Sequence, residues 1–252
     1  MTATAGSDEN LVIYRDDGIA AQSLGRFVDG QLPPLLPAVV GVTVTVILSA
    51  VGVAHLAGPM VFAPVVAMAL AGLGSGHPHD GRLDWLVPPL LQVGEYVFLA
   101  ALALARHVPI PLVFALVGAI ALHHYDVVYR VRRGAAQGQA PGAPASAAAP
   151  GSAFPAAPPR WVAKAGLGWD GRMLAAALGA TLGIEAFAFA VLAVYLWVLF
   201  GWESLTGWIG ALQHEHDGGP GGFAAGPGAA AVPGASPRAA ARRPDVEDGG
   251  GR

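Results

Sequence analysis

Four short polar motifs interrupt a chain that is otherwise rich in apolar residues, and they hold the side chains that could do chemistry. The motifs are Arg15-Asp16-Asp17-Gly18, the stretch from His77 to Asp84, His123-His124-Tyr125-Asp126 with Arg130, and Trp169-Asp170-Gly171-Arg172. Carboxylates and imidazoles can hold Mg²⁺ or Mn²⁺, and guanidinium groups bind phosphate oxygens. If the motifs meet in space, they predict a site for a phosphate or diphosphate headgroup.

Nine polar side chains of the last three motifs have a predicted role in that site. The candidate catalytic residues are His79, Asp80, Asp84, His124, Asp126 and Asp170. The four aspartates, Asp80, Asp84, Asp126 and Asp170, would bind the divalent metal or its water, and the two histidines would be ligands or acid–base groups. The phosphate would be clamped by Arg82, Arg130 and Arg172.

Each motif also has a structural interpretation without chemistry. Asp80 or Asp84, and Asp170, could cap the helices that follow them, and the arginines could act only as topology determinants. Asp126 and Arg130 have the four-residue spacing of an ion pair on one helix. What favours a joint site is that half of the eight histidines fall in these motifs: His77, His79, His123 and His124.

The elements that must position these motifs are membrane helices. Of the 252 residues 54% are hydrophobic and 12% are charged, whereas soluble domains have about 25% charged residues. Apolar segments cover residues 38–56, 59–73, 86–104, 108–125 and 173–200. We therefore predict an all-α, polytopic membrane helix bundle with about five transmembrane segments. The second segment is short and contains Pro64, so it is either tilted or re-entrant.

The polar and low-complexity segments divide the chain. Residues 1–17 form a polar N-terminal segment, residues 18–212 the membrane helical domain, and residues 213–252 a disordered tail. Inside the domain, residues 134–159 form a disordered linker rich in Ala, Pro and Gly. Residues 18–37 predict an interfacial amphipathic helix or a loose connector, and residues 202–212 predict a second interfacial helix that anchors the far end of the last span.

The distribution of basic residues predicts the orientation. Six of them lie between the fourth and fifth segments: Arg130, Arg132, Arg133, Arg160, Lys164 and Arg172. Only Arg106 lies between the third and fourth. The positive-inside rule then makes the 130–172 segment cytoplasmic in a multi-pass protein of the cell (plasma) membrane. The last three motifs share that face; if all five segments span, the first motif joins them and the tail lies outside.

Two intramembrane acids carry a second functional hypothesis. Asp80-Gly81-Arg82 and Asp170-Gly171-Arg172 each precede an apolar segment, and a glutamate follows 15 residues after each Asp, at Glu95 and Glu185. With a rise of 1.5 Å per residue, both acids would lie about 20 Å along parallel helices. Acids inside a membrane are costly, so they could relay protons or ions in a small coupled transporter. The alternative is a protonated Glu that hydrogen-bonds to a neighbouring helix, or an acid near the outer rim.

The remaining features concern assembly and excluded chemistry. Ala175, Gly179 and Gly183 follow each other at four-residue intervals, which allows close helix approach in a homo-oligomer. A third hypothesis is therefore a structural membrane partner. The sequence has no Cys, no basic nucleic-acid-binding face and no haem, iron–sulfur or nucleotide-cofactor motif, so nucleic acid is not an expected partner.

Five stretches carry a resemblance to a known family: residues 15–18, 30–34, 77–89, 123–130 and 168–173. Through them the region from Tyr14 to Trp208 resembles an actinobacterial membrane domain of unknown function, often found C-terminal to a CDP-alcohol phosphatidyltransferase module. The resemblance implies a role in phospholipid or polar-headgroup metabolism, as a headgroup transferase or its non-catalytic accessory domain, with that transferase as a partner. It carries over no catalytic residues. The transferase signature itself is incomplete, because Gln22 stands where Arg is expected.

Overall fold

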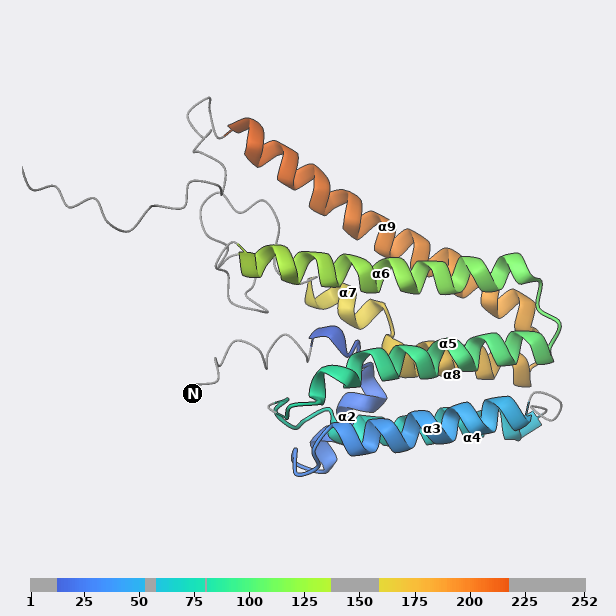
Figure 1. Ribbon diagram of the computed structural model, residues 1–252. Coiled ribbons are helices and arrows are strands. Elements are labelled where there is room, and N and C mark those ends of the chain that lie inside the picture. The colour runs from blue at the N-terminus through green and yellow to red at the C-terminus, as the bar shows by residue number, and fades with distance from the viewer. Residues whose placement is uncertain (1–12, 53–57, 80, 137–158, 218–252) are drawn as a thin grey trace, which may run out of the picture. The chain divides into compact units, whose positions relative to one another are not determined.

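The computed structural model describes residues 13–52, 58–79, 81–136 and 159–217. Within these ranges all the regular elements are helices, which run side by side in Figure 1. They are α2 (Ile19–Phe27), α3 (Leu35–Gly52), η1 (Gly58–Val61), α4 (Phe62–Ala69), η2 (Leu70–Gly74), η3 (Asp84–Leu86), α5 (Val87–Ala105), α6 (Ile110–Ala136), α7 (Arg160–Ala165), α8 (Gly168–Thr181) and α9 (Glu185–Asp217). Most of the predicted disordered linker and tail, and Asp80, lie outside the described residues.

Four described stretches are apolar and long enough to cross a membrane: Leu35–Gly52, Asp84–Ala105, Ile110–Arg133 and Glu185–Ile209. Gly58–Gly74 is a shorter apolar helix and corresponds to the predicted second segment. Its Pro64 is buried and its carbonyl accepts a hydrogen bond from Thr45 Oγ1 at 3.0 Å, so α4 packs against α3. The all-α polytopic membrane bundle is thereby confirmed.

The outer faces of the long helices are apolar. Large side chains such as Ile47, Phe114 and Val198 are more than half exposed. Soluble monomers rarely show so many exposed apolar side chains on adjoining helices, whereas lipid tails would cover them in a membrane. The exposed apolar faces and the four long apolar helices therefore indicate a membrane protein.

The predicted fifth segment, 173–200, is not one helix, and here the prediction was wrong. α8 ends at Thr181, and α9 begins at Glu185 and runs back beside α8. Gly183 has φ +70°, Ile184 N donates to Gly179 O at 2.9 Å and Gly183 N donates to Ala180 O at 3.3 Å. These are the two bonds of a Schellman ending with glycine in the left-handed region. α8 has 14 residues, about 21 Å, and is too short to cross a bilayer.

The chain therefore reverses direction once more than the sequence predicted, between α8 and α9. Trp202 and Trp208 belong to α9, a single helix of 33 residues, and do not start a separate interfacial helix. Glu203 Oε1 lies 2.7 Å from Arg130 Nη1 on α6, so this part of α9 lies beside the end of α6. The prediction that residues 202–212 anchor the opposite membrane face was wrong for this reason.

The small-residue face of α8 is used within the chain. A Cβ on Gly179 would lie 2.3 Å from the Ala188 Cβ of α9. We expect Gly179→Val to lower the free energy of unfolding by about 2 kcal/mol, because overpacking forces the two helices apart. Gly201→Val in α9 is the matched control, because nothing lies within 4 Å of a Cβ there. Thermal unfolding in detergent measures both, and equal losses would contradict the packing described here.

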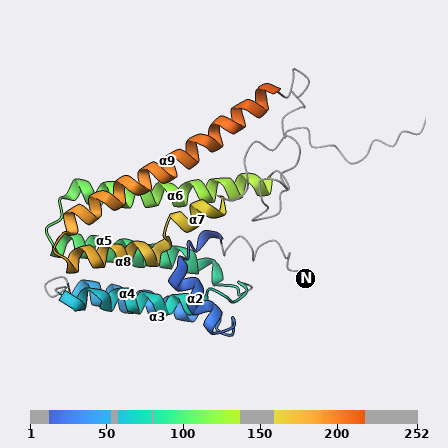
Figure 2. The ribbon, with the colours of Figure 1, turned by 180° about the vertical axis from the view of Figure 1, so that it is seen from behind.

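One end of the bundle gathers the polar motifs, and we call it the polar end. α3, α5 and α8 begin there and α6 and α9 finish there, as the two opposite views show (Figures 1 and 2). The N-terminal segment, residues 13–18, and α2 lie at this end. α2 confirms the helical alternative for residues 18–37, with Ile19 and Phe27 exposed and Ala21 buried.

Candidate functional site

The N-terminal segment is fixed to α8 by a carboxylate that caps a distant helix. Gly18 precedes α2 and offers no side chain for capping. Asp170 replaces it: Oδ1 accepts from Gly18 N at 2.6 Å, and Oδ2 accepts from Ala20 N at 2.8 Å and Ala21 N at 3.1 Å. These N–H groups have no partner within their own helix. Burial raises the pKa of Asp170, while the N–H donors act in the opposite direction.

A buried arginine joins three elements at the polar end. Arg172 on α8 is fully buried and donates to both oxygens of Glu95 on α5, from Nε at 2.6 Å and from Nη2 at 3.0 Å. Its Nη2 also lies 2.7 Å from Asp16 Oδ2, and Nη1 donates to the Gly166 carbonyl at 3.1 Å. The planar guanidinium suits this forked arrangement, which an ammonium group could not make.

Asp16 extends this network to two aromatic side chains. His124 Nε2 lies 3.3 Å from Asp16 Oδ2, and His124 Nδ1 lies 3.0 Å from the Tyr96 hydroxyl. A carboxylate can only accept, so Nε2 donates to Asp16, and the Tyr96 hydroxyl holds the ring at Nδ1. Burial alone would raise the pKa of Asp16, but the Arg172 guanidinium and the His124 hydrogen bond outweigh burial and hold that pKa well below its usual range.

A second ion pair anchors the neighbouring residues. Arg15 Nε donates to Asp17 Oδ2 at 2.6 Å, and Arg15 Nη2 donates to the Ala71 carbonyl at 3.1 Å. Trp169 Nε1 donates to Asp17 Oδ1 at 2.9 Å. His79 is buried, with Nε2 at 3.4 Å from Arg15 Nη1, and burial followed by the Arg15 charge lowers the pKa of His79. The N-terminal segment is thus tied to η2, α8 and the residues before η3.

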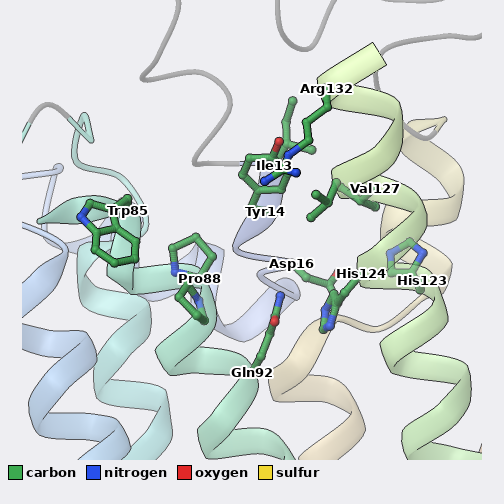
Figure 3. A pocket seen from close by; sticks show the side chains of 12 residues that line it. Ile13, Tyr14, Asp16, Trp85, Pro88, Gln92, His123, His124, Val127 and Arg132 are labelled. Atoms are coloured by element: carbon green, nitrogen blue, oxygen red, sulfur yellow. The ribbon is translucent and has the colours of Figure 1, made fainter. Parts of the chain in front are cut away.

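A pocket of about 370 Å³ opens beside this network, between the polar-end portions of α5 and α6 (Figure 3). Its lining comes from the N-terminal segment, η3, α5 and α6: Ile13, Tyr14, Asp16, Trp85, Pro88, Pro89, Gln92, His123, His124, Val127, Val128 and Arg132. Figure 3 shows Arg132 and Tyr14 toward the outer end of α6, and Asp16, His124 and Gln92 deeper in the bundle. The pocket therefore has a cationic rim and a polar floor.

The walls of the pocket are mainly apolar. Trp85, Pro88 and Pro89 stand on one side and Val127 and Val128 on the other. Such a combination of apolar walls and a few polar groups is typical of small-molecule sites. Beside the pocket, His123 stacks on Phe200 with ring centroids 3.9 Å apart, and its buried Nδ1 has no hydrogen-bond partner in the described part of the chain.

The structure brings together only some of the predicted site residues. His124 lines the pocket, while Asp170 and Arg172 hold the segment that forms its wall. Asp126 pairs with Arg130 at 2.7 Å, as the alternative of an ion pair on one helix predicted, and Arg130 also pairs with Glu203. These groups form a separate cluster between α6 and α9.

The segment before α5 contributes less than predicted. Asp84 is buried and its Oδ2 accepts from Gly81 N at 2.9 Å, Arg82 is exposed, and neither lines the pocket. His77 Nδ1 lies at hydrogen-bonding distance from the Gly30 carbonyl. Asp80 lies outside the described residues.

The aspartates predicted as metal ligands do not meet in the described ranges. Asp84, Asp126 and Asp170 each bond to a different protein group, on different elements. Among the described residues, no group of three or more His, Asp or Glu side chains is arranged to hold a metal ion. We therefore derive no metal-dependent step from this geometry.

Glu95 and Glu185 do not lie at matching positions. Glu95 lies within α5 and is fully buried against Arg172, whereas Glu185 is the first residue of α9, beyond the far end of α8. The expectation of equal depth was wrong because it assumed that α8 continues through Glu185. An acid in the first turn is favoured by the helix dipole, and Glu185 Oε2 is buried with no partner in the described residues.

Sequence reasoning left several pocket residues out of the candidate set. Asp16 was seen only as part of its motif, and Gln92, Tyr96 and Arg132 were given no role in a site. The available signal was polarity at the start of a membrane helix: Gln92 lies one turn after Pro88 and Pro89 in an otherwise apolar segment. Tyr96 follows one turn after Gln92 on the same face of its helix, and Arg132 follows two turns after His124 on the same face of the next helix.

Comparisons with known proteins give a family and no activity. A sequence model described as a family of unknown function, DUF5941, matches residues 6–148, which is more than half of the chain. All residues that line the pocket lie within the matched region. No curated protein and no solved structure matches the chain.

Proposed function

Since the chain belongs to DUF5941, a family of unknown function, we propose its function from the pocket itself: the protein binds the phosphate-bearing headgroup of a membrane lipid at the polar end of the bundle. One observation carries this proposal. The pocket combines an exposed guanidinium at its rim, Arg132, with apolar walls and a polar floor. A lipid headgroup combines the same chemical features, because an anionic phosphate adjoins apolar chains.

The position of the pocket supports a lipid as the ligand. It lies between α5 and α6, which both belong to membrane-crossing stretches. Acyl chains could lie along these helices while the phosphate stays at the level of Arg132. Trp85 at the pocket wall is more than half exposed, and tryptophan is enriched at the level of the headgroups.

The setting follows from the sequence. On the basis of the arginine distribution, the polar end faces the cytoplasm of the cell that makes the protein. The resemblance to domains fused to a CDP-alcohol phosphatidyltransferase supports a role in phospholipid or polar-headgroup metabolism, either as an accessory to such an enzyme or in the transfer itself. The pocket would then present or sense a lipid for that reaction.

The contacts of Glu95 weigh against the alternative of a proton- or ion-coupled transporter. Both oxygens of Glu95 already accept hydrogen bonds from the buried Arg172 guanidinium, so a relay through Glu95 would have to break this bidentate ion pair. Homo-oligomer formation through Gly179 is likewise disfavoured, because α9 of the same chain covers that position. Neither observation bears on lipid binding.

Lipids that differ only in the phosphate test the proposal. We expect dioctanoyl phosphatidic acid to raise the thermal stability of the detergent-purified protein, because a ligand that binds only the folded state stabilises it. Dioctanoylglycerol, which lacks the phosphate, should have little effect. Arg132→Gln should weaken the binding of phosphatidic acid about tenfold, which is the loss of one charge-assisted contact.

The matched control is Arg26→Gln. Arg26 is an exposed arginine on α2 that does not line the pocket, so its replacement removes the same charge from the same end of the protein. Its affinity for phosphatidic acid should stay within about twofold of the parent, because distant exposed charges are screened. Equal losses in the two variants would indicate general charge attraction and contradict the pocket. Equal binding of the two lipids would remove the proposal altogether.

A further inference from the structure

The carboxylate on the floor of the pocket shares its cationic partner with a second carboxylate. The guanidinium of Arg172 pairs both with Asp16, which lines the pocket, and with the fully buried Glu95. Arg15, which precedes Asp16 in the sequence, pairs with Asp17. Two carboxylates therefore share one guanidinium charge beside the pocket. Burying an unpaired charge is costly.

The free oxygen of Asp16 identifies where a counter-charge would bind. In the described part of the chain, the contacts of this carboxylate with Arg172 and His124 both use Oδ2. Asp16 lines the pocket beside Gln92, so Oδ1 remains as an acceptor for a ligand. A carboxylate accepts and does not donate, so the group that fits there is a cation with N–H donors.

We propose that the ligand headgroup carries an amine as well as a phosphate, with the ammonium group at Asp16 on the floor and the phosphate at Arg132 on the rim. This inference rests on the proposed function and narrows it to an aminophosphate headgroup such as phosphoethanolamine. The geometry supports it because both charged side chains line the same pocket, with Arg132 toward its outer end and Asp16 deeper in the bundle.

The ligand series that tests the inference uses the unaltered protein. Dioctanoyl lipids with the headgroups phosphoethanolamine, N-acetylphosphoethanolamine, phosphoglycerol and phosphate alone are compared by their dissociation constants in detergent. The phosphoethanolamine lipid should bind at least about tenfold more tightly than the other three, as one charged hydrogen bond provides. Acetylation removes the positive charge and keeps the phosphate, so it isolates the amine.

The outcomes separate the two proposals. If the acetylated lipid or phosphatidic acid binds as tightly as the phosphoethanolamine lipid, and all bind better than dioctanoylglycerol, the amine assignment is overturned and phosphate binding stands. If none binds better than dioctanoylglycerol, the proposed function itself fails.

A soluble compound distinguishes the source of the headgroup. Glycerophosphoethanolamine has the same headgroup without acyl chains, and we expect it to bind more weakly than the lipid because it buries no chains against α5 and α6. Binding as tight as that of the lipid would support the amine and phosphate contacts and assign the pocket to a free headgroup compound. In either case, tighter binding of glycerophosphoethanolamine than of glycerol 3-phosphate reports the amine contact.

A pair of variants locates the amine contact. Asp16→Asn should abolish the preference for the amine, so that the phosphoethanolamine lipid and its N-acetylated form bind equally tightly. Asp29→Asn is the matched control, because Asp29 is exposed and does not line the pocket, and this variant should keep the preference. A preference that persists in Asp16→Asn would overturn the assignment. If Asp16→Asn does not fold, the lipid series on the unaltered protein still decides.

Discussion

Replacing Arg172 by leucine should lower the free energy of unfolding by about 3–5 kcal/mol, which is the usual cost of leaving buried charges without their partner. The substitution keeps part of the apolar stem but leaves the Glu95 and Asp16 carboxylates without their shared guanidinium. It also removes the bond to the Gly166 carbonyl. Equilibrium unfolding in mixed detergent micelles measures the loss.

A double variant distinguishes charge from packing. Arg172→Leu combined with Glu95→Leu removes the bidentate pair together, so the double variant should be more stable than the Arg172→Leu single variant although it carries one more substitution. If the double variant is instead the less stable, the losses add, and the pair contributes through packing and not through charge. A single-variant loss below about 1 kcal/mol would show that the network is far less important than its burial implies.

The second large effect is expected from a single methyl group at Gly18. A Cβ there would lie 2.2 Å from both Asp170 Oδ1 and the Leu167 carbonyl oxygen, and one of these is backbone that cannot move alone. Gly18→Ala should therefore push α2 away from α8, break the cap that Asp170 provides, and cost about 3 kcal/mol or more. Since Asp16 would move too, binding of the lipid in the pocket should be lost.

Gly118→Ala is the control for this substitution. A Cβ at Gly118 meets only Trp197, at an ordinary contact distance of 3.8 Å, so the variant should be as stable as the parent or slightly more stable. Thermal unfolding and lipid binding are measured on both. If Gly18→Ala unfolds with the parent and still binds lipid, the close packing of the N-terminal segment on α8 is not required for the site.

The sequence predicted where the polar residues meet, but not what each one does. The basic residues between residues 130 and 172 placed three motifs at one end by the positive-inside rule. The structure brings together Asp16, His124 and Arg172, which come from three of the four motifs. Their partners depend on side-chain geometry over long separations, and residue type and spacing do not contain that information.

Asp170 illustrates this limit. Its position at the beginning of an apolar helix correctly suggested a capping carboxylate. The prediction assigned the cap to the helix that follows, because local capping is the common case. In the structure it caps α2, which is far away in the sequence. The available signal was Gly18, which precedes a short helix and has no side chain that could cap it. The missing cap indicates that an acceptor from elsewhere in the chain is needed.

The turn between α8 and α9 was hidden for a different reason. Residues 173–200 are apolar except for Thr181 and Glu185, so mean hydropathy alone indicates one segment. The segment is too long for one span of about 20 residues and too short for two. Gly183 followed by Ile184 and Glu185 was the available signal, since glycine commonly ends helices and acids commonly begin them. Reading Gly183 as part of a helix-packing face concealed it.

The contacts between the N-terminal segment and α8 constrain the order in which the parts of the fold can form. Gly18 and its capping carboxylate are 152 residues apart, and contacts at such separation form late because the closing of long loops is slow. During synthesis, Asp16 cannot pair with Arg172 until residue 172 has left the ribosome. A nascent chain that stops before α8 would contain every residue that lines the pocket and still have no pocket.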